Sequence, residues 1–127
     1  MIQKVLIVDD SKLARMAAAK ALKALHPDWV LLEAANAEEG LARVRDSSPE
    51  FALLDFNMPG KDGIVLAAEL RDLNPRMSIA VISANHQVEV IGRARAAGAV
   101  FLAKPLTERA LGDYLNVAVE QRSAATE

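Results

Sequence analysis

The chain has 127 residues, a hydrophobic fraction of 52% and a formal net charge of -2, which indicates one compact globular domain rather than a disordered chain. It contains no cysteine, which excludes a disulfide framework, a thiolate metal site and a cysteine nucleophile. The small net charge gives no reason to expect direct nucleic-acid binding, and no apolar run approaches the ~18 residues that cross a bilayer. We therefore expect a soluble cytoplasmic protein with no signal segment and no membrane insertion.

Strand-like and helix-like segments alternate along the chain, which predicts repeated βα units. The expected strands are short apolar runs at residues 4–8, 29–33, 51–54, 78–82 and 100–103. The expected helices lie at residues 11–25, 36–46, 64–73, 87–97 and 107–121. We expect a domain of residues 1–122, followed by a short, frayed polar tail at residues 123–127.

Local signals mark several helix ends. Asn36 with Glu39 at the third position after it predicts a capping box, and Thr107 suits the N-cap of the last helix. Gly98 suits the position just past the fourth helix. Short strands that are apolar throughout indicate a parallel sheet covered by helices on both faces. We therefore predict a flavodoxin-like, doubly wound α/β fold, with a five-stranded parallel sheet in the order 2-1-3-4-5 and five helices.

Polar side chains follow the expected strands at the point where each strand ends. Asp9 and Asp10 follow the first strand, Asp55 the third, Ser83 the fourth and Lys104 the fifth. Right-handed crossovers between parallel strands place all these ends at one edge of the sheet. Open α/β sheets bind their ligands at this edge, so we expect the side chains to form one site.

The chemistry of this set favours phosphoryl transfer. Three neighbouring carboxylates repel one another and raise their pKa values, and Mg²⁺ resolves that conflict because it prefers oxygen ligands. An aspartate can attack phosphorus and form an acyl phosphate. The transfer needs charge neutralisation and positioning, which Mg²⁺, the Lys104 ammonium, the Ser83 hydroxyl and a backbone N–H would supply.

Four segments together resemble the signature motifs of receiver domains of two-component response regulators. They read VLIVDDS at residues 5–11, LLDFNMPGKDG at 53–63, ISA at 82–84 and KP at 104–105. The resemblance covers essentially the whole chain. It implies a phosphoacceptor signalling domain that catalyses only its own phosphorylation and dephosphorylation, with a sensor histidine kinase or a histidine phosphotransfer protein as partner.

The resemblance also implies which residues take up the phosphoryl group and the metal. Asp55 would be the phosphoacceptor. Asp9, Asp10, Asp55 and the backbone carbonyl of Asn57 would hold Mg²⁺, with Asp9 acting partly through water. Asn57 and Asn85 occupy positions that tune the lifetime of the phosphorylated state in this family.

Further residues would clamp the phosphoryl group and report its presence. Lys104 would pair with a phosphoryl oxygen, and its peptide bond to Pro105 would be cis. The Ser83 hydroxyl, the Ala84 N–H and Asn57 would bind the phosphoryl group after transfer. Phe101 would be the aromatic switch residue that moves inward together with Ser83.

The resemblance places the output at a protein surface. A downstream effector would bind the face made by the fourth helix, the fifth strand and the fifth helix. The kinase would dock beside the acidic loop, through Leu13, Ala14 and Met16. The last helix lacks the charge pattern of regulators that dimerise through their fourth and fifth helices. This favours a stand-alone, chemotaxis-type regulator or phosphorelay shuttle over the receiver of a DNA-binding regulator.

Three other interpretations stay open on the sequence. A phosphatase of the haloacid-dehalogenase type also uses Mg²⁺ and an aspartate nucleophile, but it needs two aspartates separated by one residue, whereas Asp9 and Asp10 are adjacent. A flavin-binding module of similar topology would want a phosphate loop rich in Ser, Thr and Gly after the first strand. The chain could also be the receiver fragment of a larger regulator whose output domain is absent.

Overall fold

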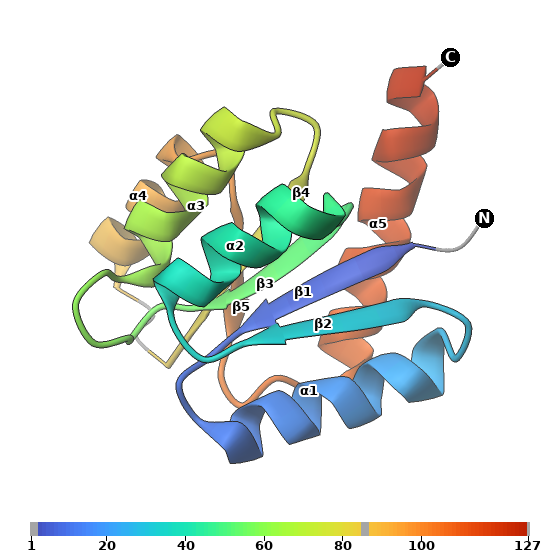
Figure 1. The fold of residues 1–127 in the computed structure, drawn as a ribbon, viewed down its shortest axis with the longest axis horizontal. Coiled ribbons are helices and arrows are strands. Elements are labelled where there is room, and N and C mark those ends of the chain that lie inside the picture. Colours follow the sequence, from blue (N-terminus) through green and yellow to red (C-terminus); the bar gives the residue numbers. More distant parts are fainter. Residues whose placement is uncertain (1–2, 85–86, 127) are drawn as a thin grey trace.

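The computed structural model describes residues 3–84 and 87–126, which form five strands alternating with five helices (Figure 1). The strands are β1 (Lys4–Val8), β2 (Val30–Ala34), β3 (Phe51–Asp55), β4 (Ser78–Ser83) and β5 (Val100–Ala103). The helices are α1 (Lys12–Leu25), α2 (Ala37–Ser47), α3 (Gly63–Leu73), α4 (Val88–Ala96) and α5 (Glu108–Thr126). Every predicted element is present.

The strands form one parallel sheet in the order β2-β1-β3-β4-β5, which confirms the predicted topology. Helices α1 and α5 contact each other on one face, and α2, α3 and α4 cover the other (Figure 1). Strand β1 pairs with β2 on one side and with β3 on the other, so the direction of winding reverses at β1. The carboxyl ends of β1 and β3 therefore border the crevice in which this architecture holds its ligands.

Side chains alternate between two cores, one on each face of the sheet. Val5 and Ile7 of β1 pack with Leu111 and Leu115 on the face of α1 and α5. Leu6 and Val8 of the same strand belong to the second core, under α2, α3 and α4. The inner strands are apolar throughout because both of their faces are buried, as the sequence pattern indicates.

The helix caps agree with the local signals, with one difference at α2. Asn36 accepts the backbone N–H of Glu39 at 2.9 Å, as a capping box requires. The Glu39 carboxylate accepts the N–H of Ala35, not that of Asn36, so its return bond lies one residue earlier than expected. Thr107 accepts the N–H of Ala110 at 3.0 Å, and Gly98 has a φ of +79°, in the left-handed region that glycine favours.

Several predicted boundaries are shifted by one residue, and two differences have a clear physical cause. Strand β2 begins at Val30, not at residue 29, because Trp29 lies in the preceding turn and stacks on His26 with ring centroids 3.7 Å apart. Helix α5 continues to Thr126, so the backbone of residues 123–126 is helical and the predicted frayed tail is wrong there. Those positions hold neither glycine nor proline and include two alanines, which favour helix.

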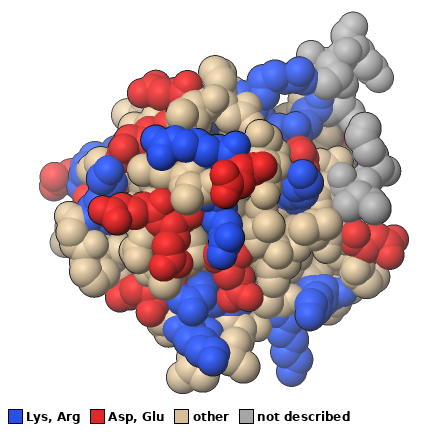
Figure 2. Space-filling view, in the orientation of Figure 1, with Lys and Arg blue, Asp and Glu red and all other residues tan. Residues whose placement is uncertain are grey.

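The distribution of surface charge and the character of the helices agree with the small net charge and the short apolar runs of the sequence. Figure 2 shows basic and acidic side chains interspersed over the face seen in Figure 1. Within residues 3–84 and 87–126, no helix is long and apolar enough to cross a membrane.

Candidate functional site

The strand ends bring the predicted polar residues to one edge of the sheet. Val8 lies opposite Leu54 in the pairing of β1 with β3, so Asp9 and Asp55, which come next in the chain, are neighbours. Asp55 lies opposite Ile82 in β4, and Ser83 lies opposite Ala103 in β5. The register therefore carries the site across four adjacent strands, β1, β3, β4 and β5.

Asp55 and Lys104 form the central ion pair of the edge. The Lys104 Nζ atom lies 2.7 Å from Asp55 Oδ1, and the Asp55 side chain is only 4% exposed. Lys104 also faces Asp9, with its Nζ atom 3.9 Å from Asp9 Oδ2. The peptide bond from Lys104 to Pro105 is cis, as the resemblance implies.

Asp9, Asp10 and Asp55 converge. One carboxylate oxygen from each lies within 4.8 Å of the other two. Asp9 and Asp55 are buried, whereas Asp10 is exposed at the rim. Three carboxylates therefore face a single ammonium group, which leaves an excess of negative charge at this edge among the described residues.

The pKa values of the site respond to burial and to this charge. Burial raises the pKa of the Asp9 carboxyl, and the negative charges of Asp55 and Asp10 raise it further, against the Ser11 N–H and Lys104, which lower it. Burial acts to lower the pKa of Lys104, but its hydrogen bond to Asp55 and the nearby carboxylate charges outweigh this and raise it. Lys104 therefore stays a cation at neutral pH. A further cation nearby would stabilise the charged form of Asp9.

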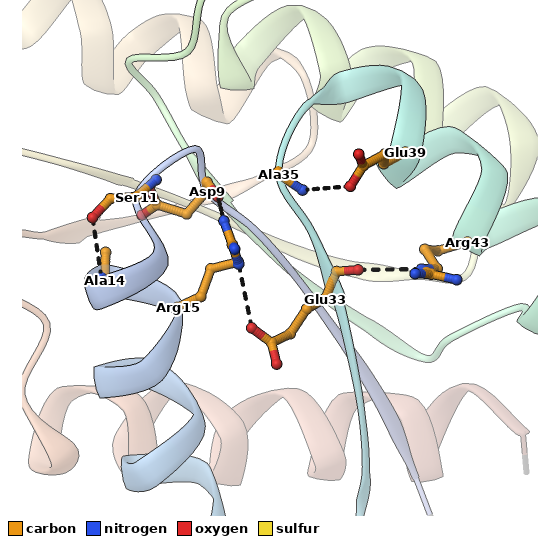
Figure 3. Close-up of polar contacts among 8 residues, drawn as sticks. All are labelled: Asp9, Ser11, Ala14, Arg15, Glu33, Ala35, Glu39 and Arg43. Carbon is orange, nitrogen blue, oxygen red and sulfur yellow. Dashed lines mark hydrogen bonds and ion pairs between the residues drawn. The ribbon is translucent and has the colours of Figure 1, made fainter.

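The loop between β1 and α1 is held by hydrogen bonds around Asp9 (Figure 3). The Asp9 N–H donates to the carbonyl of Ala34 at 3.1 Å, which extends the pairing of β1 with β2. Asp9 Oδ1 accepts the N–H of Ser11 at 2.9 Å. Ser11 in turn caps α1 by accepting the N–H of Ala14 at 3.2 Å. Asp9 Oδ2 remains directed toward Lys104.

The loop after β3 packs tightly against the backbone of Asp55. A Cβ atom added at Gly63 would lie 2.3 Å from the Asp55 carbonyl oxygen, so only glycine fits this position without a shift. Asp62 caps α3 by accepting the N–H groups of Ile64 and Val65, both at 2.9 Å. The sequence reasoning missed the role of Asp62, although an aspartate just before a helix is a usual N-cap.

The other predicted site residues lie around the same edge. Asn57 is exposed in the loop after β3. Ser83 is 1% exposed at the end of β4, where its carbonyl accepts the N–H of Lys104 at 3.0 Å, and Ala84 follows it at the surface. Phe101 is half-buried in β5 and packs against the core under α3 and α4. The prediction for Asn85 falls outside the described residues.

The donor set fits a hard divalent cation. Mg²⁺ takes oxygen ligands and needs only one or two protein carboxylates, and this edge offers three carboxylates within 4.8 Å of one another. A cation there would also counteract the rise in the pKa of Asp9, which is caused first by burial and then by the neighbouring carboxylates.

A mainly apolar cavity of about 260 Å³ adjoins the ion pair. Ala14, Ala17 and Ala18 of α1 line it, together with Pro105 and Leu106. Asp9, Asp55 and Lys104 also line it. The small side chains of α1 therefore leave room beside the Asp55 carboxylate.

The sheet order and the acidic edge define the class of the protein, and comparison with known families agrees with them. The family model of the response regulator receiver domain matches residues 5–116. The chain therefore belongs to the receiver domains of two-component response regulators, which are signalling domains.

Individual relatives lead to the same family. The chain is 31% identical to the chemotaxis protein CheY of Bacillus subtilis over 106 residues, which covers 83% of this chain and 88% of that protein. It is 35% identical to a protein-glutamate methylesterase/protein-glutamine glutaminase of Geobacter sulfurreducens over 103 residues, covering 80% of this chain and 28% of that protein. Its fold matches a CheY-like receiver domain of Methanospirillum hungatei with a TM-score of 0.90 at 24% identity, over 98% of this chain and 99% of that one.

The relatives differ in size. The matched region spans between 14% and 46% of the length of several curated relatives, which are longer proteins. The family assignment decides against the phosphatase and flavin-binding alternatives for this chain. The alternative of a missing output domain stays open.

Proposed function

We propose that the protein is a phosphoacceptor whose Asp55 takes a phosphoryl group from a phosphohistidine of a sensor kinase or phosphotransfer protein. The observation that carries this proposal is the buried Asp55 carboxylate, 2.7 Å from the Lys104 ammonium and grouped with two further carboxylates. An ion pair alone would satisfy Asp55. The surplus of acids beside it favours a site that receives a cation and a phosphoryl group.

In the transfer, an oxygen of the Asp55 carboxylate attacks the phosphorus atom, and the bond from phosphorus to the donor imidazole breaks. The imidazole keeps the electron pair and takes up a proton. Lys104 pairs with a phosphoryl oxygen as the phosphoryl group bonds to Asp55, because the Lys104 Nζ atom already lies against that carboxylate. The hydroxyl of Ser83, the last residue of β4, and the N–H of Ala84, which follows it, supply further donors at the same edge.

Asp9, Asp10, Asp55 and the carbonyl of Asn57 would hold Mg²⁺. When bound, the ion would supply positive charge that neutralises the phosphoryl oxygens. Mg²⁺ is therefore the cofactor of the proposed reaction.

The phosphoryl group then shifts a two-state equilibrium toward an effector-binding form. Ser83 turns toward the new group, and Phe101, which is only half-buried in the unphosphorylated protein, moves inward. The effector surface comprises α4, β5 and α5, where Val88, Val100 and Val117 are exposed. On phosphorylation we expect NMR shift changes at Phe101 and along α4, and these should shrink in Ser83→Ala.

The phosphodonor would dock beside α1. Leu13 and Met16 on this helix are 78% and 55% exposed, and Ala14 lines the cavity next to Asp55. An apolar surface at the mouth of the site suits a partner helix that carries the phosphohistidine. The cytoplasmic location stays a prediction from the sequence.

The test is to incubate the protein with acetyl phosphate and Mg²⁺ and to measure its intact mass. We expect the gain of one phosphoryl group, and no gain in Asp55→Asn or when Mg²⁺ is chelated. Asp28→Asn is the matched control, because Asp28 is an exposed aspartate in the turn before β2, at the opposite edge of the sheet. No mass gain in the wild type, or a gain that persists in Asp55→Asn, would contradict the proposal.

A further inference from the structure

Arg15 of α1 reaches into the loop that carries the acidic pair (Figure 3). Its side chain is only 16% exposed. The guanidinium Nη1 atom donates a hydrogen bond to the backbone carbonyl of Asp9 at 2.5 Å. This is a contact with the backbone, so Arg15 leaves both oxygens of the Asp9 carboxylate to other partners.

The Asp9 carbonyl determines the direction of Asp10. The Asp9 carbonyl and the Asp10 N–H belong to one planar peptide group, so fixing the oxygen also fixes the plane from which Asp10 continues. The Asp9 N–H is fixed as well, by the carbonyl of Ala34. With its N–H held by β2 and its carbonyl held by Arg15, Asp9 has little freedom to rotate the acidic pair away from Asp55.

Glu33 orients the guanidinium of Arg15. Its Oε1 atom lies 3.3 Å from Arg15 Nε, and β1 and β2 pair with Ile7 opposite Glu33. Figure 3 shows Arg15 between Glu33 and the Asp9 carbonyl, with Arg43 on the far side of Glu33. Arg43 donates to the Glu33 backbone carbonyl at 3.2 Å and has no drawn contact with Asp9.

We propose that Arg15 is a positioning residue of the Mg²⁺ site, which fixes the Asp9–Asp10 peptide so that both carboxylates face Asp55. This inference rests on the proposed function, because it assumes that these carboxylates bind Mg²⁺. Partners that orient metal ligands typically change metal affinity by about 10- to 100-fold when they are removed. The bond from Arg15 to a ligand residue's backbone places it in that class.

The experiment compares Arg15→Met with Arg43→Met, two variants that each remove one arginine of the same cluster. Calorimetry with Mg²⁺ alone gives the Kd for Mg²⁺. Incubation with acetyl phosphate gives the phosphorylation rate as a function of Mg²⁺ concentration. For Arg15→Met we expect the Kd for Mg²⁺ to rise about tenfold. The half-saturating Mg²⁺ concentration should rise with it, and the rate at saturating Mg²⁺ should change by less than about twofold.

Arg43→Met should bind Mg²⁺ as the wild type does, since Arg43 contacts Glu33 and not the acidic loop. Arg15→Lys should recover part of the affinity, because an ammonium can still donate to the carbonyl but lacks the planar fork with which arginine bonds the carbonyl and Glu33 at once. Glu33→Gln should raise the Kd about threefold, because Arg15 loses a charged partner while the fold keeps every core residue.

The outcomes separate this inference from the proposed function. Wild-type protein that neither binds Mg²⁺ nor gains a phosphoryl group contradicts the proposed function itself. Wild-type binding together with an unchanged Kd in Arg15→Met contradicts the role of Arg15 alone, and so does an equal loss in Arg43→Met. Should Arg15→Met not fold, by circular dichroism, an unchanged Kd in both Arg15→Lys and Glu33→Gln overturns the inference.

Discussion

The two ends of the sheet differ in how far their charged and polar groups are paired within the protein. At the carboxyl edge, Asp9, Asp10 and Asp55 face one lysine, and burial and like charges raise the pKa of Asp9. At the amino edge, Arg71 donates to the carbonyls of Pro75, Met77 and Gly98, and the Tyr114 and Ser78 hydroxyls share a hydrogen bond of 2.6 Å.

This difference separates stability from function within one small domain. The polar groups of the amino edge hydrogen-bond to other groups of the protein, so changes there should act on folding. The carboxyl edge leaves negative charge uncompensated, so changes there should act on what the protein binds.

Mg²⁺ should stabilise the folded protein through the carboxyl edge. At 100 times its Kd, a ligand of the folded state adds about 2.7 kcal/mol to the free energy of unfolding. We expect this gain in urea titrations of the wild type and its near-complete loss in Asp10→Asn. Asp28→Asn, at the opposite edge, should keep the gain. An equal gain in Asp10→Asn would show that the ion binds elsewhere.

Arg71→Met should destabilise the fold without changing the Kd for Mg²⁺ at the carboxyl edge. The guanidinium bonds three carbonyls, and two of these bonds are exposed enough for water to replace them. We therefore expect a loss of about 2 kcal/mol in the free energy of unfolding. Arg95→Met, at an exposed position of α4, should change it by less than about 0.5 kcal/mol. A changed Kd for Mg²⁺ in Arg71→Met would break the separation between the two edges.

Tyr114→Phe should cost about 1 kcal/mol at neutral pH, because Ser78 loses its partner. Burial raises the pKa of Tyr114 from 10.0 to about 12, against the opposing hydrogen bond to Ser78. Between these values the unfolded chain loses the phenolic proton and the folded protein keeps it, so folding stability falls as the pH rises. Below pH 10 this contribution is fully present.

The phenylalanine variant has no such group, and Tyr114 is the sole tyrosine of the chain. The fall in stability above pH 10 should therefore be steeper in the wild type than in Tyr114→Phe, as followed by urea unfolding. Parallel curves in this range would mean that Tyr114 is as accessible in the folded protein as in the unfolded chain.

The fold and the main site residues were predictable because their signals are local. Asp9, Asp55 and Lys104 each directly follow a short apolar run, and Asp10 follows Asp9. Parallel connections bring such positions to one edge. Asn36 and Thr107 were readable as caps for the same reason, since each bonds a backbone N–H three residues ahead.

The remaining contacts depend on packing between distant segments. Arg15 and Glu33 are 18 residues apart and meet only because β2 lies beside β1. No spacing in the sequence indicates that pair. The end of α5 was missed because a polar composition favours a tail, whereas Ala124 and Ala125 sustain the helix as far as Thr126.

The single tryptophan determines what fluorescence can report about this protein. Trp29 lies between His26 and Phe51, with ring centroids 3.7 and 5.3 Å away, and Phe51 begins the strand that Asp55 ends. Phe51 and Asp55 are four residues of extended strand apart, about 13 Å, so the indole packs at the end of β3 away from Asp55. Its emission should therefore follow the unfolding of the chain closely and remain almost silent when Asp55 is modified.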